Sequence, residues 1–209
     1  CREVAQSGRR GAEMITLNVH HPEIETFINI KKDKTKVTGA NISIKLSDEF
    51  MKAVKQDREY EQRWPIDALV PVVKRTVRAR DIWDQIIQAA WESAEPGLLF
   101  WDTAIKFTPS DIYSAEGYSS VSTNPCGEII LSEYDSCRLI VENLYSFVEN
   151  PFTQKAKFNF KLFNEITIKT QRLMDDLIDL EMEQIDKILA KIDSDPEPDE
   201  IKSREISLW

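Results

Sequence analysis

Three side chains able to do chemistry are spaced two residues apart near the middle of the chain: the amide of Asn124, the thiol of Cys126 and the carboxylate of Glu128. In an extended backbone alternate side chains point to the same side, so the three groups would converge. Pro125 lacks a backbone N–H and Gly127 loosens the backbone, which favours an irregular loop over a central strand. We expect this loop to present the three groups together.

The composition of this loop limits the chemistry of its thiol. The carboxylate of Glu128 disfavours a thiolate at Cys126 by like-charge repulsion, and residues 124–128 include no His or Lys that would stabilise one. The trio therefore suits a reaction in which the sulfur is not required as a thiolate.

A second cysteine, Cys137, lies eleven residues beyond Cys126. Residues 133–136 favour a turn, so the two sulfurs would approach each other if the chain folds back there. The alternative is that both cysteines are small buried core residues, the usual position of an intracellular cysteine. Spacing alone favours this alternative. With Cys1 the chain has three cysteines, too few for a secreted disulfide scaffold.

A glycine- and arginine-rich segment lies near the start of the chain. Taken alone, such a segment is more often a solvated basic turn than a phosphate or nucleotide contact, and it does not match the longer glycine fingerprints. Its residues are Gln6, Ser7, Gly8, Arg9, Arg10 and Gly11.

The elements that must position these groups alternate between strands and helices in the first half of the chain. Such alternation predicts an α/β architecture whose strands are mostly parallel and covered by helices, with sites in the loops at strand ends. Ser47 is placed to cap one of the helices. The pattern predicts strands over residues 14–19, 41–46 and 98–101, the last of them buried, and helices over residues 21–31, 47–54 and 80–93.

The second half of the chain is less regular. We expect a polar loop over residues 114–123, a strand over 129–131 and a second β-prone run from Leu139. Residues 160–192 keep helical spacing of apolar side chains opposite an acidic face, as one long helix or two abutting ones. The Pro- and Glu-rich residues 193–200 break this pattern and predict an exposed linker.

Composition excludes several classes of function. The chain has 209 residues and a net charge of -9, the wrong sign for a protein that binds nucleic acid by counterion release. No apolar stretch approaches the roughly 20 residues that cross a bilayer, and the adjacent His20 and His21 cannot complete a metal site alone. We expect a soluble cytoplasmic protein that binds no membrane, nucleic acid or structural metal.

Five short motifs follow one another in the first part of the chain: residues 7–14 (SGRRGAEM), 21–28 (HPEI with Phe27-Ile28), 41–43 (NIS), 95–97 (EPG) and 124–128 (NPCGE). Over residues 1–144 they resemble, in order and approximate spacing, the motifs of ribonucleotide reductase catalytic subunits. The sequence Asn-Pro-Cys-Gly-Glu with a second cysteine eleven residues on is most similar to the adenosylcobalamin-dependent class, class II. The resemblance implies part of a ten-stranded α/β barrel with a central finger loop. It implies a partial barrel in residues 1–150 and a helical segment with an acidic, Pro-containing linker in residues 151–209.

The resemblance also implies a role for each catalytic candidate. Cys126 would become the thiyl radical that abstracts the 3′ hydrogen of the ribose, and Glu128 would take the 3′ hydroxyl proton as general base. Asn124 would orient the sugar through its hydroxyls. Cys137 would be one of two cysteines that are oxidised to a disulfide, with its partner upstream of residue 6 and absent from this chain.

The resemblance further implies ligands and partners. Residues 6–11 would form the specificity loop between a dNTP or ATP effector and the substrate base, with Gln6, Arg9 and Arg10 reading the base. The cofactor would be adenosylcobalamin, the substrate a ribonucleoside diphosphate or triphosphate, the reductant a thioredoxin-like protein, and the assembly a homodimer. The alternatives are a class I large subunit with a separate radical-generating subunit, or a non-catalytic fragment that needs complementary polypeptides.

The same resemblance makes the chain an internal portion of such a subunit, which needs the remaining segments of the enzyme to complete the barrel. Cys1 is then either the residue that follows an intein splice junction or the result of an arbitrary truncation. A partial barrel would expose strand edges and apolar surface, so we expect the isolated chain to be marginally stable and inactive.

Overall fold

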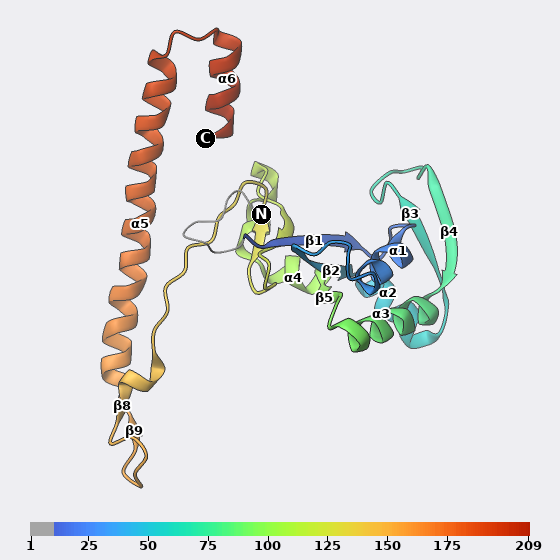
Figure 1. The fold of residues 1–209 in the computed structure, drawn as a ribbon, viewed down its shortest axis with the longest axis horizontal. Helices are drawn as coiled ribbons and strands as arrows, with labels where there is room; N and C mark the ends of the chain where they lie inside the picture. Colours follow the sequence, from blue (N-terminus) through green and yellow to red (C-terminus); the bar gives the residue numbers. More distant parts are fainter. Residues whose placement is uncertain (1–10) are drawn as a thin grey trace. The chain divides into compact units, whose positions relative to one another are not determined.

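The computed structural model describes residues 11–209, which fall into two compact units (Figure 1). The N-terminal unit comprises Cys1–Cys137 and the C-terminal unit Arg138–Trp209. The family resemblance placed the end of the partial barrel near residue 150, and that boundary stays a prediction.

A three-stranded parallel sheet organises the N-terminal unit, in the order β1-β2-β5. The helices that connect its strands bury an apolar core, so the predicted alternation and parallel pairing are confirmed for this sheet. The strands are β1 (Glu13–Asn18), β2 (Ala40–Leu46) and β5 (Gly97–Phe100), and the helices are α1 (Ile24–Asn29), the short 3-10 helix η2 (Ile30–Lys32), α2 (Asp48–Gln56) and α3 (Ala79–Ser93).

The central strand β2 has two chemically different faces. Ile44 and Leu46 are 0% and 1% exposed and pack into the helical core. Because side chains alternate along a strand, Asn41, Ser43 and Lys45 lie on the opposite face. The sheet thus presents a polar face away from its helices.

The helix ends follow local rules. Ser47 caps α2, since its Oγ accepts a hydrogen bond from the Phe50 N–H at 3.1 Å, as the sequence predicts. Helix α3 buries Ile82 and Ile86 at helical spacing and ends where Ala94 adopts a left-handed φ of 61°.

Two antiparallel hairpins complete the N-terminal unit. The first joins β3 (Glu59–Trp64) to β4 (Val73–Arg78), a region in which sequence patterning predicts no element. The second joins β6 (Ser120–Thr123) to β7 (Ile130–Ser132) and carries residues 124–129 at its tip; we call residues 120–132 the finger. Between β5 and the finger lie α4 (Trp101–Phe107) and the 3-10 helix η3 (Pro109–Glu116).

Two expectations for this region are wrong. The run over residues 98–101 is not a buried strand, because Trp101 begins α4 and Leu98 and Phe100 are 37% and 51% exposed. The physical reason is that β5 is an edge strand of its sheet, paired with β2 alone. Residues 114–123 are not one polar loop, since they include the end of η3 and all of β6.

The C-terminal unit is dominated by a single helix, α5 (Phe160–Ser194), rather than two abutting ones. Asn159 caps it by accepting a hydrogen bond from the Leu162 N–H at 2.9 Å. The predicted β-prone run from Leu139 does not form a strand, and the linker is shorter than expected because α6 begins at Asp199. The unit also contains the 3-10 helix η4 (Leu144–Phe147), β8 (Val148–Glu149), β9 (Lys157–Phe158) and α6 (Asp199–Leu208).

The α/β class is confirmed, but the strands described here do not form a closed barrel. Over the described residues, no helix is both long enough and apolar enough to span a membrane.

Candidate functional site: the finger and its pocket

The tip of the finger is a tight turn rather than an extended segment. The Gly127 N–H donates to the Asn124 carbonyl at 2.9 Å, and the Asn124 N–H donates to the Ile129 carbonyl at 3.2 Å. Gly127 has a φ of +81°, a conformation that suits glycine. The predicted irregular loop is therefore confirmed, whereas the side-chain alternation of an extended backbone does not apply at its tip.

Asn124 is part of the turn that holds this tip together. Its Oδ1 accepts a hydrogen bond from the Ile129 N–H at 3.0 Å, in addition to the two backbone contacts of the same residue. The amide oxygen is therefore engaged in structure, and the Nδ2 group is the part of this side chain that can donate to a ligand.

The structure places both predicted cysteines at the surface. Cys126 at the finger tip and Cys137 beyond β7 are exposed, so the alternative that they are buried core residues is wrong. Glu128 is also exposed. An exposed carboxylate next to an accessible thiol suits proton transfer to a bound molecule.

The finger is docked on the polar face of the parallel sheet by side-chain contacts. From β2, the Asn41 Nδ2 donates to the Pro125 carbonyl at 2.6 Å, and Lys45 donates to the Val121 carbonyl. From β1, the Thr16 and Ser122 hydroxyls lie 3.2 Å apart.

A cavity of about 440 Å³ lies between the finger tip and the sheet. It is at the amino-terminal ends of the three parallel strands, since its lining includes Met14, Asn41 and Gly97, near the start of each. Four of the five resemblance motifs meet there, all except residues 21–28. The lining residues from these motifs that bear on the argument are Asn41, Ser43, Glu95, Gly97, Pro125 and Cys126.

Glu95 is a functional candidate whose role the residue pattern did not indicate. Its Oε1 accepts a hydrogen bond from the Ile42 N–H at 3.1 Å, and its Oε2 lies 2.5 Å from the Lys31 Nζ. The Lys31 ammonium also donates to the Ala40 carbonyl. This pair fixes the loop after α3 against the start of β2 and so shapes one wall of the cavity.

Lys45 is a partly buried cation on the finger side of β2. Burial lowers the pKa of its ammonium below the ordinary value. The Nζ lies 4.1 Å from the centre of the Trp101 ring, a cation–π arrangement that compensates for lost water.

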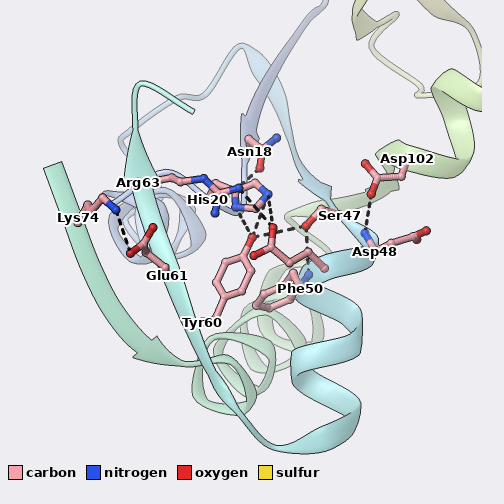
Figure 2. Close-up of polar contacts among 11 residues, drawn as sticks. Asn18, His20, Ser47, Asp48, Phe50, Tyr60, Glu61, Arg63, Lys74 and Asp102 are labelled. Atoms are coloured by element: carbon pink, nitrogen blue, oxygen red, sulfur yellow. Dashed lines mark hydrogen bonds and ion pairs between the residues drawn. The ribbon is translucent and has the colours of Figure 1, made fainter. Parts of the chain in front are cut away.

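A second polar cluster lies beyond the opposite, carboxyl ends of β1 and β2, around His20 (Figure 2). The Tyr60 hydroxyl lies 3.0 Å from the His20 Nε2 and 3.5 Å from the Ser47 Oγ. Burial, and next the charge of Arg63, lowers the pKa of His20, and burial raises that of Tyr60. Because both rings are nearly inaccessible, at 6% and 3% exposure, this cluster is structural.

The described part of the chain offers no candidate metal centre around either histidine. Among residues 11–209, no group of three His, Cys, Asp or Glu side chains is placed to hold a metal ion. A larger cavity of about 550 Å³, lined by Tyr113, Tyr118 and Tyr134, contains none of the predicted catalytic residues.

The predicted specificity loop is mostly outside the described residues. This applies to Gln6, Ser7, Gly8, Arg9 and Arg10. Gly11 is described, and it is exposed and lies two residues before β1.

Comparison with known proteins identifies the family of this chain. A family model described as "Ribonucleotide reductase, barrel domain" matches residues 1–195. The chain belongs to this family. The matched residues include the finger, with Asn124, Cys126 and Glu128, and the cavity beside it.

Individual relatives carry more specific names. The chain is 37% identical, over 194 residues, to a vitamin B12-dependent ribonucleoside-diphosphate reductase of Thermoplasma acidophilum, which covers 88% of the chain and 23% of that protein. It is 29% identical to the protein of the same name from Mycobacterium tuberculosis, over 82% of the chain and 23% of that protein. A vitamin B12-dependent ribonucleotide reductase of Streptomyces clavuligerus is 27% identical over 76% of the chain and 18% of that protein. The chain thus spans about a quarter or less of the length of these relatives.

Proposed function

We propose that this chain forms the finger-bearing part of the barrel of an adenosylcobalamin-dependent ribonucleotide reductase, and that it works together with the remaining segments of the barrel. The observation that carries the proposal is the accessible Cys126 thiol at the tip of the finger, beside a cavity lined by residues of four of the five motifs. The names of the relatives support the cobalamin-dependent class over a class I large subunit.

The substrate class that the relatives favour is the ribonucleoside diphosphate, because two of them are named for it. When bound, adenosylcobalamin supplies the oxidising equivalent that turns the Cys126 thiol into a thiyl radical. The described residue that fits this chemistry is Cys126 itself, since its sulfur is accessible at the finger tip and the residue lines the cavity.

In the proposed reaction the Cys126 sulfur takes the 3′ hydrogen atom of the ribose and becomes a thiol again. Glu128 accepts the proton of the 3′ hydroxyl, and the 2′ hydroxyl leaves as water after protonation. The Nδ2 of Asn124 donates a hydrogen bond to a ribose hydroxyl and orients the sugar, while its Oδ1 keeps the turn closed.

Two electrons and two protons must come from a thiol pair, which is oxidised to a disulfide as the product forms. We assign Cys137 as one thiol of this pair, with the other supplied by another segment of the enzyme, well upstream of residues 6–11, and not by Cys1. At the end of turnover the 3′ hydrogen returns from Cys126 to the product, which regenerates the radical. A thioredoxin-like protein then reduces the disulfide.

We extend the proposal to the assembly and its regulation. Residues 6–11 would form a specificity loop that links a dNTP or ATP effector to the choice of base, in a cytoplasmic homodimer. Completion of a ten-stranded barrel around the finger would cover the exposed edge strand β5.

The test uses a reductase assembled from this chain and the remaining barrel segments, supplied with adenosylcobalamin, effector and a ribonucleoside diphosphate. We expect Cys126→Ser to abolish deoxyribonucleotide formation, because the O–H bond of serine is too strong to give the radical that would accept the 3′ hydrogen atom. Cys1→Ser is the matched control and should retain turnover. Normal multiple turnover by the Cys126 variant would refute the proposed role.

A further inference from the structure

We propose that Asn41 and Lys45 of β2 are positioning residues that set the height and register of the finger over the sheet, and thereby the position of the Cys126 sulfur. This role in positioning rests on the proposed function of Cys126. The docking contacts themselves do not depend on it.

The first observation is the bond from Asn41 to the residue before the thiol. The Asn41 Nδ2 donates to the Pro125 carbonyl at 2.6 Å, across 84 positions of sequence. That carbonyl belongs to the planar peptide group between Pro125 and Cys126. Any displacement of this peptide group therefore moves the Cα of Cys126 directly.

The second observation is that Lys45 contacts the finger at its other end. Its ammonium donates to the Val121 carbonyl in β6 and lies 4.1 Å from the centre of the Trp101 ring. Asn41 and Lys45 are four residues apart on one face of the same strand, so a single rigid element contacts both the base and the tip of the finger.

The third observation is that the finger lacks a backbone ladder to the sheet. Its strand β6 pairs with β7 alone, and the described contacts that join it to the parallel sheet come from side chains, including the Thr16 and Ser122 hydroxyls 3.2 Å apart. Side-chain donors therefore determine where the finger lies. Asn41 also lines the cavity, so its amide is close to the space in which substrate would bind.

The first test measures hydrogen–deuterium exchange in the 209-residue chain. We expect Asn41→Ala to raise exchange of residues 120–132 by about fivefold, the effect of losing one hydrogen bond. The Gly127 and Ile129 N–H groups report this, because they donate within the turn. Exchange in α3 and in the β3–β4 hairpin should stay unchanged, and Asn41→Gln, which keeps the donor, should restore part of the protection.

The matched control is Asn29→Ala. Asn29 also donates through Nδ2 to a backbone carbonyl, that of Glu25 at 2.7 Å, but it lies in α1 and does not contact the finger. Its loss should leave exchange in residues 120–132 at the wild-type level. Equal exchange of the finger in the Asn41→Ala variant and the wild type would overturn the docking role.

A second pair of variants covers the case in which Asn41→Ala unfolds the N-terminal unit. Lys45→Met keeps a long unbranched side chain but removes both the donor to Val121 and the cation over Trp101, whereas Lys45→Arg keeps a donor and a charge. We expect raised exchange of the finger in the methionine variant and recovery in the arginine variant. Lys74→Met, which removes an exposed ion pair with Glu61 on the β3–β4 hairpin, is the control.

The second test measures kinetics in the assembled reductase. A displaced sulfur should lower kcat by about tenfold or more with little change in KM, because positioning of the reacting atom is lost while binding is kept. If the wild-type assembly forms no deoxyribonucleotide, the proposed function fails and the exchange result still tests the docking. If the wild type turns over and the Asn41→Ala and Lys45→Met variants both match its kcat, the positioning role of Asn41 and Lys45 is refuted, while the proposed function stands.

Discussion

A Cβ atom at Gly97 would lie 2.6 Å from the Oγ of Ser43, the residue that Gly97 faces across the β2–β5 pair. Ser43 is itself 4% exposed, so its hydroxyl has little room to move. The close approach of β2 and β5 at the wall of the cavity therefore requires a residue without a side chain at position 97, the glycine of the Glu-Pro-Gly motif. This relationship connects two motifs that are far apart in sequence.

Replacement of Gly97 by alanine should destabilise the N-terminal unit by about 1–3 kcal/mol through overpacking. Adding Ser43→Ala should recover most of this loss, because the remaining Ser43 Cβ would be 3.6 Å from the new methyl group. Urea unfolding of the single and double variants measures both effects. If the double variant is no more stable than Gly97→Ala alone, the close approach is not the cause.

The ion pair between Glu95 and Lys31 should show measurable coupling. Their side chains are 23% and 16% exposed, so the pair is shielded from water more than a surface pair. We expect a double-mutant cycle with Glu95→Gln and Lys31→Met to give a coupling free energy of about 1 kcal/mol. The exposed pair between Lys74 and Glu61 is the reference, and its coupling should be smaller.

The buried His20 should make stability depend on pH. Burial lowers its pKa in the folded state below the ordinary 6.5 of the unfolded chain. The neutral His20 therefore leaves the free energy of unfolding at its full value above pH 6.5. As the pH falls from there toward the folded-state pKa, this free energy declines, because the unfolded chain binds the proton more strongly than the folded chain. Unfolding free energies measured between pH 7.5 and pH 5 should show this decline.

The control for that titration is the neighbouring histidine. His20→Gln should flatten the pH dependence over this interval, whereas His21→Gln, at a half-buried position, should leave the decline in place. If the unfolding free energy of the His20→Gln variant declined with the same slope as that of the wild type, the pH dependence would come from groups other than His20.

The Cys137→Ser variant should lose multiple turnover. The proposed thiol pair cannot form its disulfide without this sulfur, so the assembled reductase should complete at most one aberrant turnover per site. Rapid-quench measurement of product per site distinguishes this from the complete loss expected for Cys126→Ser. Steady multiple turnover would exclude Cys137 from the pair.

Sequence patterning could predict the elements whose periodicity is strong. Strands β1 and β2 and helix α3 follow it because their apolar positions recur with the period of a strand or a helix. The β3–β4 hairpin could not be predicted, because strand β4 is nearly all exposed and its sequence, VKRTVR, has no buried run. Its order comes from cross-strand pairing, which a local pattern does not contain.

The residues of the finger could be predicted, but their geometry could not. Residue types alone identify Asn124, Cys126 and Glu128 as a chemical group. The turn at Gly127 depends on the pairing of β6 with β7, and the contact of Asn41 with Pro125 depends on the fold of 84 intervening positions. The cavity is therefore a product of tertiary structure, although the motifs that line it are visible in the sequence.

The two faces of β2 place a constraint on any insertion or deletion in that strand. Shifting it by one residue would turn Ile42 and Ile44 toward the finger and Asn41 and Lys45 toward the helical core. Both the apolar packing against the helices and the side-chain contacts of β2 with the finger would then be lost. Strand β2 should accordingly tolerate substitutions but keep its length, so that the position of the finger can change by substitution and not by an insertion or deletion in this strand.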